Sequence, residues 1–199
     1  RLRRERLGSE AVACPPLART TALACLYQLV TQVGLPAEPA YDALAMFDAY
    51  LAHSECSGKE VGVADLPIVC TVLARLQWKD NCSACRGLKP AFANAPAWVA
   101  QQLSGAGFEV AVAPPATEQA LLAAELELLQ VLQWRVCVPS LAKWTRALFK
   151  RLALFLDERQ QERFRAMWQQ SMRLVHEVMM HQALALHCPP QRMARGLMV

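Results

Sequence analysis

Glycine and charged side chains are scarce in this sequence, and their scarcity excludes several classes of protein. Only 8 of the 199 residues are glycine, and none of them forms a glycine-rich loop of the kind that binds phosphate groups. Charged residues make up 19% of the chain and apolar residues 54%, which is too apolar for an intrinsically disordered regulator. The chain is therefore expected to fold around a real core, as one domain or two small ones.

Long uninterrupted apolar runs are also missing. Charged residues break the most apolar segments at Asp65, Arg75, Glu125 and Glu127, so no segment has the length and purity of a membrane span. We expect no membrane partner. The chain begins RLRRER rather than with methionine, and no apolar signal segment follows. We therefore expect it to be a fragment of a longer protein.

The positive charge is not arranged as in most nucleic-acid-binding proteins. The formal net charge is +4, and much of it lies in a basic N-terminal segment, residues 1–16, and in the second half of the chain. No basic stripe with interleaved aromatic residues accompanies this segment, so binding to nucleic acid is disfavoured. Two of the eight cysteines, Cys25 and Cys70, lie inside apolar helical patterns, where free thiols behave as small hydrophobic groups. A reducing compartment, the nucleus or the cytoplasm, is expected.

Motifs for metal binding and catalysis are incomplete. Cys82 and Cys85 have the spacing of half a zinc site, but no second Cys-x-x-Cys or histidine pair completes it nearby. His176 and His181 are five residues apart, about 140° around a helix, whereas the zinc-protease motif requires a spacing of four. We therefore expect no metal, no cofactor and no enzymatic activity.

Helical periodicity runs through almost the whole chain, and no period-2 alternation extends beyond a few residues. Asp65 and Thr117 are the predicted N-caps of two helices, and residues 80–96 are predicted to be irregular. The predicted helices cover residues 19–33, 38–53, 66–79, 97–103, about 117–134, 141–156 and about 163–187, with a short final helix from Pro189-Pro190. The chain is thus predicted to be all-α, with one compact unit up to Trp134 and a shorter helical unit after it.

Several helix ends resemble those of the cyclin family. The end Asp48-Ala49-Tyr50-Leu51 is similar to the Asp-Arg-Phe-Leu that closes a cyclin-box helix, and Lys79-Asp80-Asn81 resembles the lysine and acidic residues that end the next one. Further along, Ala124-Glu125 falls on the family's Met-Glu, Trp134 on its Phe, and Pro139-Ser140 on its Pro-Thr. The resemblance covers about residues 19–144 and continues more weakly to the C-terminus.

The resemblance implies both an architecture and a function. It implies a cyclin-box five-helix bundle at residues 17–137, with a long insertion at about 80–116, and a second, divergent or truncated helical repeat at 138–199. It also implies a regulatory subunit that binds and activates a cyclin-dependent protein kinase. Such a subunit presses on the mobile helix of the kinase and lets the kinase form its internal Lys–Glu ion pair.

The resemblance also assigns roles to single residues. In cyclins a lysine and a glutamate lie close together and bind the N-terminal lobe of the kinase, and here they correspond to Lys79 and Glu125. The possible periphery of this interface comprises Asp80, Leu121 and Leu128, while Phe47 and Asp48 are expected to be structural. The family's substrate-docking patch is poorly kept: Arg19 is retained, but Cys25 replaces a tryptophan, so docking of basic substrates there is not expected.

Other interpretations stay open from the sequence alone. Glu125 can be a solvated helix residue or the structural partner of Lys79, and Glu127 is expected at the surface because it is two residues further along the helix. The chain can also be a cyclin-fold transcription factor of the TFIIB type, which would need a basic surface spread over several helices. A scaffold that binds peptides without a kinase partner is a third possibility, and it would not need Lys79 and Glu125 together.

Overall fold

The computed structural model describes residues 16–35, 37–56, 58, 61–81, 89–111, 115–136, 140–156, 160–180 and 190–196. All regular elements in these ranges are helical, as predicted from the sequence. In chain order they are α1 (Pro16–Gln32), α2 (Ala37–Cys56), the 3-10 helix η2 (Val63–Asp65), α3 (Leu66–Asn81), α4 (Lys89–Gly105), α5 (Glu118–Val131), α6 (Leu141–Ala153), α7 (Gln161–Met180) and α9 (Pro190–Gly196). None of the described helices is both long and apolar enough to cross a membrane.

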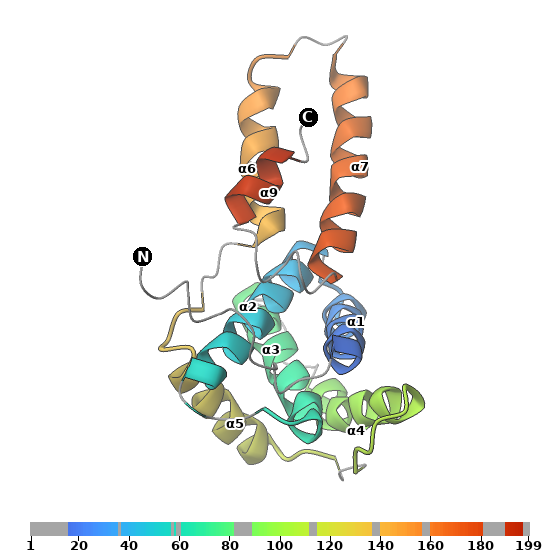
Figure 1. Cartoon of the computed structure of the whole chain (residues 1–199), viewed down its shortest axis with the longest axis vertical. Helices are drawn as coiled ribbons and strands as arrows, with labels where there is room; N and C mark the ends of the chain where they lie inside the picture. The colour runs from blue at the N-terminus through green and yellow to red at the C-terminus, as the bar shows by residue number, and fades with distance from the viewer. Residues whose placement is uncertain are drawn as a thin grey trace.

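Helix α3 is the centre of the first unit, which comprises α1 to α5 (Figure 1). It packs against α1, α2, α4 and α5, and every residue from Val69 to Trp78 is buried. A helix that is apolar nearly all round is stable only when neighbours cover every side, so this position was predictable. Asp65 was predicted as the N-cap of this helix. Its carboxylate instead accepts a hydrogen bond from the upstream Gly62 N at 2.9 Å.

The structure corrects the prediction that residues 80–96 are irregular. Helix α4 begins at Lys89 and continues through Pro96. Proline inside a helix removes one hydrogen bond and usually kinks or ends the helix, which is why the sequence predicted only residues 97–103. Here tertiary packing outweighs that cost, because α4 packs against α3 and α1 and buries Phe92, Val99 and Leu103. Part of the segment 80–116 is therefore integral to the bundle core; residues 82–88 lie outside the described part.

A buried ion pair joins α1 to α2. Arg19 is fully buried, and its guanidinium donates to both Asp48 carboxylate oxygens at 2.7 Å. Burial raises the pKa of Asp48, and the neighbouring Arg19 charge opposes that rise. Phe47, the preceding residue, is also fully buried. Both Phe47 and Asp48 therefore serve the packing of the bundle rather than its surface.

The buried cysteines behave as the sequence analysis expected. Cys25 on α1 and Cys70 on α3 are buried free thiols, and the Cys70 thiol donates a hydrogen bond to the Ala22 carbonyl at 3.4 Å. Burial raises the pKa of Cys25 to about 11, so this side chain is a neutral thiol at physiological pH. Both residues act as small apolar groups in the core.

A second unit, formed by α6, α7 and α9, extends from the first (Figure 1). Helix α6 packs against α7, α9 and α2. Two ion pairs link α6 to α2: Lys143 Nζ lies 2.9 Å from Asp42 Oδ2, and Arg146 Nη1 lies 2.7 Å from Glu38 Oε2. The predicted helix at about 163–187 runs from Gln161 to Met180, and residues 181–189 lie outside the described part.

Candidate functional site

The predicted site lies where α5 crosses α3, and the start of α5 sets its geometry. Thr117 is the N-cap, as predicted, and its hydroxyl accepts a hydrogen bond from Ala120 N at 3.2 Å. This bond satisfies one of the N–H groups that a helix leaves without a partner in its first turn. Glu118 lies in that first turn, where a negative charge is favoured by the helix dipole.

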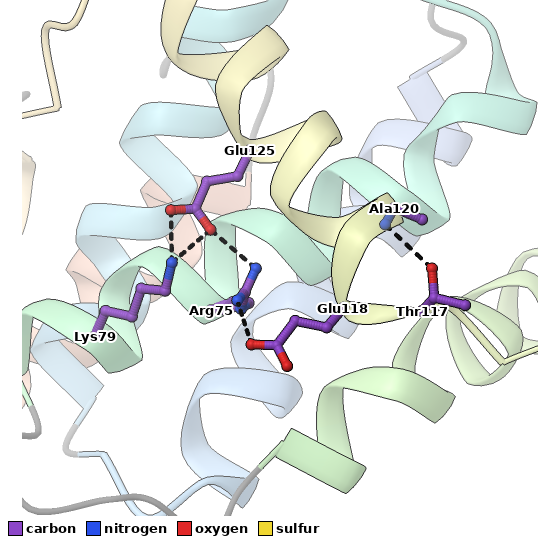
Figure 2. A network of polar contacts seen from close by, with 6 residues as sticks. All are labelled: Arg75, Lys79, Thr117, Glu118, Ala120 and Glu125. Carbon is purple, nitrogen blue, oxygen red and sulfur yellow. Dashed lines mark hydrogen bonds and ion pairs between the residues drawn. The ribbon is translucent and has the colours of Figure 1, made fainter.

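One face of α5 carries Glu125 toward α3. Leu121, Leu128 and Leu132 are buried on α5 and at its C-cap. They lie four, three and seven residues from Glu125, spacings that place all four side chains on one side of the helix. The leucines pack in the core. Glu125 emerges from the same side, beside the α3 side chains (Figure 2).

Two cations of α3 contact the Glu125 carboxylate. Lys79 Nζ donates to Oε1 and to Oε2, each at 2.7 Å. Arg75 Nη1 donates to Oε2 at 3.0 Å, and Arg75 Nη2 lies 3.8 Å from Glu118 Oε1 (Figure 2). The two predicted residues, Lys79 and Glu125, are therefore brought into direct contact, within a cluster of two positive and two negative side chains.

The sequence analysis missed Arg75 as a member of this cluster and treated it only as an interruption of an apolar run. A signal was present, because Arg75 precedes Lys79 by four residues and residues at that spacing share one face of a helix. Its side chain is only 9% exposed. A buried arginine normally has a carboxylate partner, so a partner on a neighbouring helix could have been expected.

The three residues expected at the periphery have different outcomes. Leu121 and Leu128 are 4% and 3% exposed, so placing them at the edge of a contact surface was wrong: α3 and α2 cover that side of α5. Asp80 lies in the last turn of α3, and its side chain is outside the described part. Glu127 is exposed, as expected.

Exposed apolar side chains do occur on α5 and just after it, at other positions of the same segment. Leu122 and Leu126 on α5 are 46% and 48% exposed, and Trp134 is 62% exposed. Gln133 and Trp134 have positive φ angles of 53° and 59°, a conformation that costs non-glycine residues roughly 1–2 kcal/mol each. Trp134 is thus displayed to solvent by a strained turn at the end of α5.

Two observations on the described residues concern metal ions and small ligands. No group of three or more His, Cys, Asp or Glu side chains within them could hold a metal ion, and Cys82 and Cys85 lie outside the described ranges. A cleft bordered by Asp65, Val72 and Glu127 has a volume of about 60 Å³. Sites for small organic ligands have volumes of roughly 300–1,000 Å³, so this cleft is too small for such a ligand.

Comparisons with known proteins give no family for the chain. No family model, curated protein or solved structure matches it. The function must therefore be argued from the geometry of the α3–α5 surface and from the resemblance of its motifs.

Proposed function

We propose that this chain is a cyclin-like regulatory subunit that binds and activates a cyclin-dependent protein kinase. The observation that supports the proposal most is the contact between Lys79 and Glu125 across α3 and α5, with both Lys79 Nζ–carboxylate distances at 2.7 Å. These are the two positions that the cyclin resemblance assigns to kinase binding. They lie 46 residues apart in the sequence, and helix packing alone brings them together.

The surroundings of the pair suit a protein partner. Exposed Leu122, Leu126 and Trp134 lie on or beside the helix that carries Glu125. Large apolar side chains, and tryptophan above all, supply much of the energy of protein–protein interfaces when a partner covers them. The ion pair would fix the orientation of that partner. A strained turn that exposes a tryptophan is also typical of functional surfaces.

Activation follows from selective binding to one conformation of the kinase. The subunit would press on the mobile helix of the kinase and favour the state in which the internal Lys–Glu pair of the kinase positions ATP. Converting a kinase from about 1% to about 99% active requires roughly 5.5 kcal/mol of differential binding. An interface of ordinary size, about 800 Å² on each partner, can supply this through a few buried apolar anchors. The subunit would act in the nucleus or the cytoplasm.

The basic residues of α6 give less support to a DNA-binding role of the TFIIB type. Two of the four cations on this helix are engaged by acidic residues of α2: Lys143 by Asp42 and Arg146 by Glu38. Their charge is largely neutralised within the chain. Binding to phosphates requires cations that can replace the counterions of the nucleic acid, and these two are already paired.

The test is affinity capture of protein kinases from a cell extract, followed by an activity assay and identification of the recovered kinase. The wild-type chain is compared with Lys79→Ala/Glu125→Ala and with Leu126→Asp. Leu126 is half exposed, so its replacement should leave the fold intact. Two matched controls lie away from the site: Arg146→Ala/Glu38→Ala removes an ion pair with the same 2.7 Å distance, and Leu154→Asp changes a leucine that is 82% exposed.

The expected result is recovery of a cyclin-dependent kinase by the wild type and both controls, with a loss of about tenfold or more for the two site variants. Circular dichroism of each variant checks that its helices remain folded. Recovery of no kinase, or equal recovery by site variants and controls, would refute the activator function. Binding that depends on the basic residues and falls steeply with salt would instead favour the transcription-factor interpretation.

A further inference from the structure

The two cations on Glu125 differ sharply in their surroundings. The Arg75 side chain is 9% exposed and the Glu125 side chain 12% exposed, whereas Lys79 is 36% exposed. The Arg75–Glu125 contact is thus almost enclosed by the protein, and the Lys79–Glu125 contact is open on one side. The negative charge of Glu125 is therefore balanced by one buried cation, Arg75, and by one partly exposed cation, Lys79.

The chemistry of the two side chains matches this difference. Arginine stays charged at any physiological pH, and its planar guanidinium can donate to two acceptors at fixed angles. Arg75 uses that fork to approach Glu125 at 3.0 Å and Glu118 at 3.8 Å. These two carboxylates are about two turns apart on the same face of α5. Lysine is a compact, strongly hydrated charge on a flexible stem, so Lys79 can reorient at little cost.

We infer that the two cations have separate roles: Arg75 is a positioning residue that holds Glu125 and α5 in place, which frees Lys79 to leave Glu125 and donate to an acceptor on the partner. The acceptor would be a carboxylate or a main-chain carbonyl. This inference rests on the proposed function for the identity of the partner, but the role of Arg75 is a property of the free chain.

The reason lies in the cost of an uncompensated buried charge. If Lys79 were the only cation beside Glu125, its departure toward a partner would leave a carboxylate with little solvent access and no counter-charge, which is strongly unfavourable. Arg75 removes that cost because it stays in place. Lys79 can then exchange one acceptor for another, and the ion pair contributes to binding instead of opposing it.

The free chain provides the first experiment, which is amide hydrogen exchange of α5 in Arg75→Met, Arg75→Lys and Lys79→Met. Arg75→Met should speed exchange along α5 by about tenfold or more, Arg75→Lys by less, and Lys79→Met by no more than about threefold. Arg146→Met, which breaks the exposed ion pair to Glu38, is the matched control and should leave α5 unchanged. The inference is overturned if Lys79→Met loosens α5 as much as Arg75→Met does.

The second experiment measures the affinity of the same variants for the cyclin-dependent kinase captured by the wild type. Lys79→Met should weaken binding by about tenfold while α5 amide exchange rises by no more than about threefold, and Arg75→Lys should retain most of the affinity. A larger loss for Arg75→Lys than for Lys79→Met would mean that Arg75 itself contacts the partner, which contradicts a positioning role. If no kinase binds the wild type, the proposed function fails, and so does the transfer of Lys79 from Glu125 to an acceptor on the partner. The amide hydrogen exchange of α5 still decides the role of Arg75.

Discussion

Two carboxylates of similar exposure hold two different helix pairs together, and they are stabilised in different ways. Glu125 joins α5 to α3 and is 12% exposed, while Asp42 joins α2 to α6 and is 14% exposed. Glu125 accepts from two cations, Arg75 and Lys79. Among the described residues, Asp42 has one cation, Lys143 at 2.9 Å, and one neutral donor, the Ser140 hydroxyl at 2.7 Å.

Because of this difference, the contacts of Glu125 can be rearranged and those of Asp42 cannot. The Ser140 hydroxyl donates to Asp42 and also accepts from Lys143 N as the N-cap of α6, so it couples the carboxylate to the start of a helix. Losing either partner of Asp42 disturbs the junction of the two units. Glu125 can lose Lys79 and still keep the charge of Arg75 beside it.

Arg75→Met should have the largest effect on stability. It leaves Glu125 with only the exposed Lys79, and we expect the free energy of unfolding to fall by about 2–3 kcal/mol, near the lower end for breaking a buried ion pair. Urea denaturation of the variant beside wild type measures the loss. A change below about 0.5 kcal/mol would show that the enclosed ion pair contributes no more than a surface one.

Ser140→Ala should have the next largest effect and can be compared with the other capped helix. Thr117→Ala removes only the N-cap bond of α5 and should cost about 1 kcal/mol. Ser140→Ala removes the N-cap bond of α6 and also the hydrogen bond to Asp42, so about 2 kcal/mol is expected. Thermal unfolding of both variants provides the measurement, and equal losses would mean that the bond to Asp42 adds nothing.

Lys79 and Lys143 should differ in their effects on both stability and binding. Lys79→Met leaves Arg75 beside Glu125 and should lower the free energy of unfolding by less than about 1 kcal/mol. Lys143→Met leaves Asp42, which is 14% exposed, without this cation and should lower it by about 1–2 kcal/mol. Kinase affinity should fall about tenfold for Lys79→Met and stay unchanged for Lys143→Met. Isothermal titration calorimetry with the captured kinase gives both affinities. Equal affinity losses for the two variants would contradict the prediction that Lys79, and not Lys143, contacts the kinase.

Arg146→Met should have the smallest effect. Its ion pair with Glu38 joins side chains that are 48% and 28% exposed, so water and salt screen most of the attraction. We expect a change within about 0.5 kcal/mol in urea denaturation. A loss of 2 kcal/mol would show that the α2–α6 junction depends on its outer ion pair as much as on Asp42.

Much of the helical architecture was predictable because periodicity and helix signals are local. Gly34, with φ of 81°, follows α1 as expected of a residue that tolerates the left-handed region. Thr117 caps α5, and the starts of α7 and α9 lie within two residues of the predicted positions. Helix α4 was underestimated because Pro96 argues locally against a helix, and only its packing on α3 and α1 outweighs that preference.

The candidate site was predictable in part. The resemblance of two helical segments to those of cyclins named Lys79 and Glu125, and the fold places the two side chains in contact. The same resemblance suggested Leu121 and Leu128 as possible periphery, but both are buried, because neighbouring helices cover that side of α5. The sequence analysis missed Arg75 because a charged residue within an apolar run is taken as a break in that run until its partner on another helix is known.

The sequence by itself determined the helical character of this protein, the positions of most helix ends and the composition of a core rich enough to bury α3. These properties depend on residues a few positions apart, so they can be derived without coordinates. The tertiary structure decided which side of α5 is covered, which leucines remain exposed, and that Glu125 has two cations where Asp42 has one. Those features depend on the approach of α3 to α5 and of α2 to α6. The contacts concerned join Lys79 to Glu125 and Ser140 to Asp42, which are 46 and 98 positions apart, so only the packed chain specifies them.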